Sequence, residues 1–371
     1  MKRLGWILVL LMAVSPAWAA KKFTVQQLTD LLVSMQRYNK TDEDEANQLK
    51  EIELNEELTD SAANSLRSYL PGPLSDERIE ILKRQSAFLA PPATDLPSNP
   101  VPDAAAQQAI LAKAADFASR VYAQNPHLSV TKTTLRFEDQ VITTNSIGLQ
   151  NTNMLLNPVQ LANTQVEPVE TDKGVENAAV SRAKTKWGEN GRISEGEPGT
   201  NLGAIFLEAS SSGKISWLRW QMIDGWQTAV FSFAVEKKKS HLDVSYCCFP
   251  KTDTVVMGNG PMTTGTTSIT TWEPFKKVVG YHGEFFINPN TGLVVRVITR
   301  AEMKPTDFVL MEDRRIDYSS VVFAGKAYML PRASITSMVA VPNGDSNTTT
   351  HTIRHTLFLT SYQNYKLAGT F

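Results

Sequence analysis

Residues 281–296 read YHGEFFINPNTGLVVR, and this stretch decides the fold of the second half of the chain. Its apolar residues Phe285 and Ile287 alternate with other side chains, which is the two-residue period of a β-strand with one apolar face. The NPNTG sequence at 288–292 combines the residue types that favour a tight turn. Apolar residues resume directly after it, so we predict a β-hairpin with strands at 284–287 and 293–300.

Turn signals and β-branched runs of this kind recur along most of the chain. Asp224-Gly225 and the AGK sequence at 324–326 each separate two runs of strand-forming residues. Because short turns join most of these runs, we expect an antiparallel meander. We predict further strands at 130–137, 215–223, 228–235, 241–249, 316–323, 328–340 and 348–360, and a Gly/Thr-rich loop at 258–271.

The first part of the chain has the apolar spacing of helices instead. Thr24 precedes apolar residues at helical spacing, and Thr41 precedes the acidic run 42–45, which suits the positive N-terminus of a helix. We predict four short helices that begin near these residues, near 60 and near 75. The third ends at 69, and the fourth continues to 89.

The predicted fold class is α+β, with a small N-terminal α-helical domain followed by a helix-covered, curved antiparallel sheet. Five prolines keep the segment between the two parts extended. An Ala-rich helix at 103–123 and a short helix at 199–210 are expected to pack on the sheet. The predicted segments are a signal peptide at 1–19, the helical domain at 20–90, a Pro-rich linker at 91–102, and the sheet domain at 103–371 with an insertion at about 139–198.

The N-terminal residues have the layout of a secretory signal peptide. Lys2 and Arg3 precede an apolar run at 4–14, and the AWA sequence ends at Ala19 with small residues where a signal peptidase reads. We expect cleavage after Ala19 and a location in the periplasm or outside the cell. The alternative is an uncleaved membrane anchor, but the run is shorter than the roughly 20 residues that span a bilayer. We expect no later membrane-spanning segment.

The charge of the chain argues against two classes of partner. The 371 residues carry a formal net charge of −1, and 42% of them are hydrophobic, as in a globular protein. Removing Lys2 and Arg3 with the leader leaves 35 basic against 38 acidic residues, a net charge near −3. We therefore expect no nucleic acid partner, and membrane contact that is peripheral or absent.

The two cysteines are adjacent, at Cys247 and Cys248. Neighbouring residues of a strand point to opposite faces, so one buried and one partly exposed thiol is the simplest interpretation. A disulfide between the two, or a disulfide with a partner in an oxidising compartment, are the alternatives.

No familiar catalytic or metal-binding motif stands out. His351 and His355 are four residues apart in a predicted strand, about 13 Å by strand rise, so we expect no shared metal ion. The GNGP loop at 258–261 lacks the lysine of a phosphate loop, and no G-x-S-x-G sequence occurs. We interpret His282 as a structural histidine and the acidic pair at 138–139 as part of a solvated turn. No cofactor is expected.

The hairpin at 281–296 resembles the G-x-x-x-I-D/N-P-x-T-G-x-V-x-R hairpin of the outer-membrane lipoprotein carriers and sigma-factor regulators, the LolA and RseB proteins. As in those families, it is followed by Asp317-Tyr318, by the AGK turn and by Leu330-Pro331. The stretch ISEGEPG at 193–199 is similar to a set of exported bacterial proteins that join such a sheet to N-terminal helices. The resemblance implies a half β-barrel over 103–371.

Relatives of this kind bind acyl chains in an apolar cavity or sense lipidated or unfolded outer-membrane components. By itself the apolar sheet face is most simply a filled core, and a ligand groove under the curved sheet is the alternative that the resemblance implies. Tryptophans can line such grooves, although Trp226, next to a turn, is not among our candidates. The candidate ligand-binding residues are Trp217, Trp220, Phe231, Phe233, Tyr246, Phe285 and Ile287.

We predict from these features an exported binding protein for a hydrophobic envelope ligand, such as an acyl chain, a lipoprotein or a lipid, that acts without catalysis. One alternative is a regulatory protein-interaction module of the cell envelope that docks a partner through the helices at 24–89. The other is a hydrolase with a dispersed site, which a polar cleft holding histidine or carboxylates would favour.

Overall fold

The computed structural model describes most of the chain after the predicted leader. The described backbone covers residues 21–123, 128–139, 156–166, 168–171, 174–177, 202–257, 265–323, 325–340 and 354–367. None of the helices in these ranges combines the length and the apolar character that a membrane crossing requires. Several features of the sequence lie outside the described residues: the leader at 1–19, the stretch at 193–199, the loop at 258–261, His351, and the side chains of Glu138, Asp139, Cys247 and Cys248.

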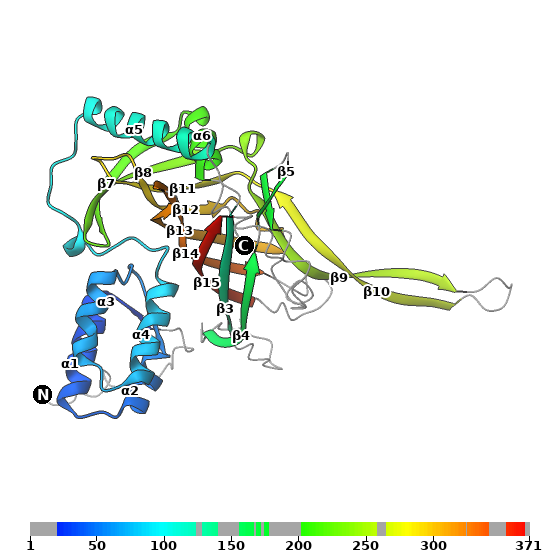
Figure 1. The fold of residues 1–371 in the computed structure, drawn as a ribbon. Helices are drawn as coiled ribbons and strands as arrows, with labels where there is room; N and C mark the ends of the chain where they lie inside the picture. The colour runs from blue at the N-terminus through cyan, green and yellow to red at the C-terminus, as the bar shows by residue number, and fades with distance from the viewer. Residues whose placement is uncertain are drawn as a thin grey trace, which may run out of the picture.

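The N-terminal part, drawn in blue in Figure 1, is mainly helical. The predicted N-caps Thr24 and Thr41 are confirmed, since the Oγ1 atom of each accepts a hydrogen bond of 3.1 Å from a backbone N–H of the first turn. A parallel pair of short strands was not predicted. The elements are β1 (Lys21–Phe23), α1 (Val25–Arg37), α2 (Asp42–Leu49), β2 (Ile52–Leu54), α3 (Asp60–Leu66), η1 (Arg67–Tyr69), α4 (Pro73–Gln85) and η2 (Ala93–Asp95).

The fourth helix differs from its prediction at both ends. It begins at Pro73, ahead of residue 75, because proline suits the first position of a helix, and it ends at Gln85 rather than at 89. The helices enclose a core of aliphatic side chains in which Leu28, Leu32 and Ile79 are fully buried. This part of the chain therefore has a hydrophobic core of its own.

The rest of the described chain is built on one open antiparallel sheet of nine strands, which is not closed into a barrel. This confirms the α+β class and the antiparallel sheet. The strand order is β4-β3-β15-β14-β13-β12-β11-β8-β7. The strands are β3 (Leu128–Asp139), β4 (Leu156–Val166), β7 (Ile215–Ile223), β8 (Trp226–Val235), β11 (Tyr281–Ile287), β12 (Val294–Ala301), β13 (Val309–Phe323), β14 (Lys326–Ala340) and β15 (Arg354–Leu367).

The hairpin at 281–296 is confirmed as the pair β11 and β12. In its turn the N–H of Gly292 donates to the carbonyl of Asn288 at 2.9 Å, and the Asn288 side chain accepts from the N–H of Asn290 at 3.0 Å. Gly292 has a φ of 76°, a conformation that glycine adopts without strain. Asn288 therefore supplies the side-chain acceptor of this turn, and Gly292 supplies its positive φ.

Two segments differ from their predictions, and the predicted insertion contains strands. The 258–271 loop is wrong in part, since its later residues belong to β10 (Gly265–Val278), which pairs with β9 (Asp243–Met257) in a long hairpin that projects from the molecule in Figure 1. Threonine-rich runs favour strands, and this propensity outweighs the glycines. Part of the predicted insertion forms β4, which extends the sheet beside β3, and the short hairpin of β5 (Pro168–Thr171) and β6 (Gly174–Asn177). The last strand begins at Arg354 and continues to Leu367, beyond residue 360.

The two faces of the nine-stranded sheet are covered by different parts of the chain. Helices α5 (Ala104–Ala123) and α6 (Leu202–Ser212) pack on one face, which we call the helix-covered face; it contains Phe231, Phe285, Ile287, Val297 and Ile316. The N-terminal helical part packs on the other, which we call the docking face; it contains Val230, Phe286, Arg296, Ile298 and Arg315. Neighbouring residues such as Phe285 and Phe286 thus point in opposite directions.

Candidate functional site

Most of the predicted ligand-binding residues lie on the helix-covered face. Phe231, Phe233, Phe285 and Ile287 belong to its core and expose at most 3% of their surface. The ring of Phe285 stacks on Phe233 with centroids 4.2 Å apart and contacts Phe206 of α6 at 5.1 Å. These side chains fill the space between the sheet and the helices, so they contact one another.

The remaining predicted residues, Trp217, Trp220 and Tyr246, lie in two different settings. Trp217 and Trp220 pack edge to face at 4.8 Å against the rim of the same core and are partly buried. The indole N–H of Trp220 donates to the carbonyl of Pro100 at 2.9 Å, which ties the linker to β7. Tyr246 is buried in a separate cluster with Phe249, and both residues belong to the first half of β9. Trp226 is 67% exposed next to its turn.

The helix-covered face has a shallow hollow between α5, α6 and the start of β7. It has a volume of about 370 Å³ and is lined by small and apolar residues that include Leu111, Ala115 and Ile215. No charged side chain lines it. Because Ser210 is the one polar side chain in its described lining and the hollow is shallow, we place the candidate site elsewhere.

The docking face holds a buried cluster of charges to which the helical part contributes one residue, Glu57. Its carboxylate lies 3.3 Å from an Nη1 of Arg315 and 3.8 Å from Nη1 of Arg296, and it accepts a hydrogen bond of 3.2 Å from Gln221. Both arginines also pair with Asp317, Arg296 through Nε and Arg315 at 3.2 Å. Two arginines therefore face two carboxylates inside the interface, and we call these four residues the charge clamp.

Burial and pairing act in opposite directions on the acids of the charge clamp. Burial alone would raise the pKa of Asp317, but Arg296 and Arg315 hold it well below its usual range. Burial raises the pKa of Glu57, and the same two arginines offset this only in part. Because each carboxylate is matched by an arginine, the charge clamp acts as a structural contact that fixes the helical part on the sheet.

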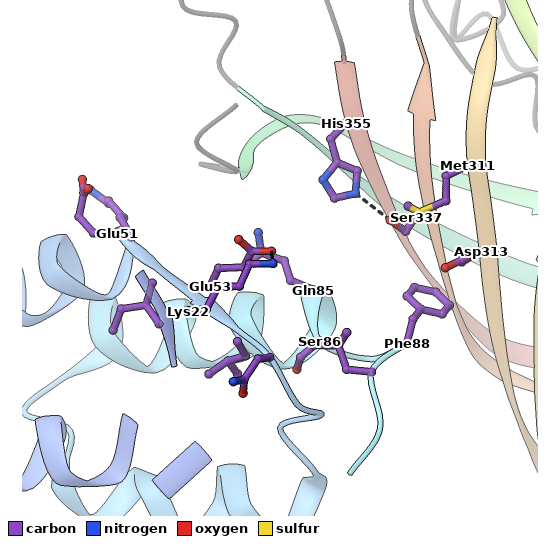
Figure 2. Close-up of a pocket in the computed structure, with 15 residues that line it drawn as sticks. Lys22, Glu51, Glu53, Gln85, Ser86, Phe88, Met311, Asp313, Ser337 and His355 are labelled. Atoms are coloured by element: carbon purple, nitrogen blue, oxygen red, sulfur yellow. Dashed lines mark hydrogen bonds and ion pairs between the residues drawn. The ribbon is translucent and has the colours of Figure 1, made fainter. Parts of the chain in front are cut away.

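A cleft lies beside the charge clamp, between the helical part and strands β13, β14 and β15 (Figure 2). We call it the domain cleft; it has a volume of about 330 Å³. The end of α4, the residues that follow it, and β2 form one wall, and the sheet forms the other. Its apolar lining consists of Ile52, Leu54, Phe88, Leu89 and Met311.

Polar side chains line both walls of the domain cleft. The sheet contributes Asp313, Ser337 and His355, which we call the polar end, and the helical part contributes Lys22, Lys50, Glu51, Glu53, Asn55, Gln85 and Ser86. The Oγ atom of Ser337 lies 2.7 Å from Nε2 of His355, and both side chains are buried. Nδ1 of His355 is buried and has no hydrogen-bond partner among the described residues. Figure 2 shows that the histidine ring lies between the strands and the helical part, with this nitrogen pointing away from Ser337. Asp313 is the cross-strand neighbour of Ser337 on β13.

The two titratable groups of this polar end have shifted pKa values. Burial lowers the pKa of His355 to about 4, so the imidazole is neutral at pH 7. Burial raises the pKa of Asp313 to about 6, although Arg300 lowers it and Glu312 raises it further. Perturbed groups that line a cleft are typical of functional sites.

The serine and histidine have the contact of a nucleophile and its base, but the third group of a catalytic triad is displaced. A triad places a carboxylate on the other nitrogen of the histidine, to orient the ring and to stabilise its charged form. Here Asp313 lies across from Ser337, and Nδ1 of His355 has no partner in the described part of the chain. A histidine with a pKa of about 4 is also a weak base at neutral pH. The arrangement suits hydrogen-bonded recognition better than proton transfer.

Metal binding finds no support in the ranges that the structure describes, where no three His, Cys, Asp or Glu side chains gather in a way that could hold an ion. His355 lies in β15, as predicted for a strand, and contacts serine. The half-exposed His282 lies 3.9 Å from Glu302, at the start of the decisive hairpin.

The residues of the domain cleft escaped prediction for identifiable reasons. We considered His355 only as a metal ligand because of its spacing from His351. Its place on the inward face of a strand, in line with Leu357, was a signal that could have marked it as buried. No local sequence pattern marks Ser337, Asp313 or Glu57 as site residues. They come together only through the strand pairing and through the docking of the helical part.

Comparisons of the chain with models of protein families, with curated proteins and with solved structures find no match.

Proposed function

We propose that the chain is an exported binding protein that takes the apolar part of an envelope ligand into the domain cleft, without covalent chemistry. The observation that carries this proposal is the cleft itself, a cavity of about 330 Å³ built jointly by the helical part and the sheet. Junctions between domains are where ligand pockets preferentially occur, and pockets are mostly apolar with a few placed polar groups. The domain cleft lies at such a junction, and its apolar side chains are accompanied by polar groups on both walls.

The size of the cleft limits the ligand. At roughly 30 Å³ for each atom of water-like size, it holds on the order of eleven non-hydrogen atoms. That is enough for a medium-length acyl chain or for one end of a longer chain, and too little for a whole phospholipid. Burying the chain against Phe88, Leu89 and Met311 would contribute about 25 cal/mol per Å² of apolar surface removed from water.

We further propose that the sheet domain is related to the half β-barrel of the LolA and RseB proteins and that the chain acts in the periplasm. Support comes from the hairpin sequence at 281–296, from a helix followed by an open antiparallel sheet, and from the leader-like sequence at 1–19. The acyl-binding cavity that the resemblance implies would lie under the covering helices. Aromatic rings occupy that position here, so we assign the ligand to the docking face.

Calorimetric titration of octan-1-ol into the protein tests the proposed site. We expect one saturable site in the unaltered chain and at least tenfold weaker binding in Met311→Trp, because the larger ring fills the cleft. Met222→Trp is the matched control, since Met222 is 45% exposed on β7 and lines no part of the cleft. Equal binding by Met311→Trp, or no binding by the unaltered chain, would contradict the proposal.

A hydrolase is the second candidate, and the contact of 2.7 Å between Ser337 and His355 is the observation that favours it. A p-nitrophenyl octanoate assay distinguishes the two functions. Hydrolysis that is faster than in buffer and that disappears in both Ser337→Ala and His355→Gln would establish an esterase. We expect no such loss, because His355 lacks an orienting carboxylate among the described residues.

A further inference from the structure

One polar atom in the domain cleft has no role in holding the fold together. Nδ1 of His355 is buried without a hydrogen-bond partner in the described chain, while the whole residue is only 6% exposed. A buried donor or acceptor without a partner is costly, and such atoms are rare in folded proteins. His355 lines the cleft, and Figure 2 shows this nitrogen turned away from Ser337, so a molecule bound in the cleft can supply its partner once the ring is uncovered.

The hydrogen bond to Ser337 leaves Nδ1 of His355 free to act either as a donor or as an acceptor. When the serine hydroxyl donates to Nε2, the proton of the neutral ring is on Nδ1, which then donates to an oxygen acceptor. When Nε2 donates to the serine oxygen, Nδ1 accepts from a hydroxyl or an amide N–H. Because Ser337 can rotate between these roles, the site matches any neutral group that carries a hydrogen-bonding oxygen or N–H.

The charges near the polar end disfavour ionic head groups. The neutral ring of His355 supplies no countercharge to an anion, and the carboxyl group of Asp313 is the cross-strand neighbour of Ser337. The positive charge of Arg300 acts on Asp313 and opposes a second cation beside it. Lys22 and Glu53, which lie 3.7 Å apart, line the cleft together with Lys50 and Glu51, so its helical wall carries two charges of each sign. A buried charge without a matching partner is strongly unfavourable.

We infer that the domain cleft selects an amphiphile with an uncharged head, an alcohol, ester or amide, that hydrogen-bonds Nδ1 of His355 while its chain lies against Phe88, Leu89 and Met311. This inference rests on the proposed function and names the class of its ligand. The histidine is a recognition residue here, and no bond of the ligand is broken.

Three ligands with the same chain and different heads test the inference by calorimetric titration at pH 7.5. They are octan-1-ol, octanoate and octylammonium. We expect octan-1-ol to bind at least tenfold more tightly than either ion. The variant His355→Phe removes the hydrogen bond but keeps an aromatic ring, and we expect it to weaken octan-1-ol about tenfold. We expect it to change the affinities for the two ions less than twofold.

Two further variants keep the test interpretable if His355→Phe folds poorly. His355→Gln retains a donor and an acceptor and should recover part of the affinity for octan-1-ol. Ser337→Ala leaves the histidine in place and should weaken octan-1-ol by less than His355→Phe does. Circular dichroism checks that each variant is folded.

The outcomes separate the two proposals. If none of the three ligands binds, or if Met311→Trp binds them unchanged, the proposed function is wrong. If all three bind equally and Met311→Trp blocks them, the site is correct and the inference about the head group is wrong. Tighter binding of octanoate or octylammonium than of octan-1-ol, if lost in His355→Phe, would also contradict the inference. It would show that the ligand of the cleft carries a charge.

Discussion

The two faces of the sheet differ in how their space is filled, as the neighbours Phe285 and Phe286 on β11 illustrate. Phe285 points into the helix-covered face, where it stacks on Phe233 and is fully buried by α6. Phe286 points into the docking face, where its ring lies 5.5 Å from the guanidinium group of Arg296 and 5.8 Å from that of Arg219. One face is an aromatic core, and the other mixes rings with charges.

This difference explains where the cavity lies. Apolar side chains without directional contacts can shift until they fill the space between sheet and helices. The charge clamp cannot, because Glu57, Arg296 and Arg315 need definite distances to one another. The helical part is therefore held at a spacing set by its ion pairs, and the domain cleft remains beside them.

Removing the carboxylate of Glu57 is expected to have the largest effect. Glu57→Ala leaves Arg296 and Arg315 buried with only Asp317 to balance them, which should lower the free energy of unfolding by about 3–5 kcal/mol. Urea unfolding measures the loss. Glu53→Ala is the matched control, since its pair with Lys22 is partly exposed and should contribute about 0–1 kcal/mol. Equal losses in both variants would mean that the clamp does not hold the interface.

Truncating Phe285 tests whether the helix-covered face is filled. Phe285→Ala should lower the free energy of unfolding by about 3–5 kcal/mol, because it opens a hole among rings that cannot move in to close it. Urea unfolding again provides the measurement. A loss below about 1 kcal/mol would indicate an open cavity under α6, as the family resemblance implies. The helix-covered face would then be no more filled than the docking face.

The pH dependence of stability probes the docking face through His355. Its pKa is about 4 in the folded protein and 6.5 in the unfolded chain, so the unfolded chain binds more protons between these values. His355 should therefore contribute a rise in stability of about 3 kcal/mol at most as pH rises from about 4 to 6.5, while Asp313, with its pKa raised to about 6, acts in the opposite direction in the unaltered chain and in the variants alike. Urea midpoints across this range should lose that rise in His355→Gln. Ser337→Ala should retain it, since the histidine stays buried; a profile unchanged by His355→Gln would refute the assignment.

The smallest effect concerns the linker on the helix-covered side. Trp220→Phe keeps the ring but removes the hydrogen bond from the indole N–H to the carbonyl of Pro100, which should cost about 0.5–1.5 kcal/mol. Limited proteolysis of the segment 91–102 should become faster in this variant than in the unaltered chain. An unchanged cleavage rate would show that this contact does not hold the linker.

The strands and helices were predictable to the extent that local pattern decides them. The 281–296 hairpin, the caps Thr24 and Thr41 and the apolar face that contains Phe231 and Phe285 all follow from spacing and turn chemistry. The Thr-rich β10 did not, because glycine and β-branched residues gave opposing signals over 258–271.

The candidate site was not predictable, because no short stretch of sequence contains it. Asp313, Ser337 and His355 come from three strands that meet only through pairing, and Phe88 comes from a segment more than 200 positions earlier in the chain. Glu57 is one acid among many until the helical part places it between two arginines.

The sequence by itself therefore determined the elements and the class of fold, since hydrophobic period, capping and turn residues act over a few neighbours. Only the tertiary structure decided which sheet face is filled and which is hollow, because that depends on which part of the chain covers each face. It also decided that His355 contacts Ser337 and faces a cleft, because burial and pairing between distant strands arise only when the chain is folded.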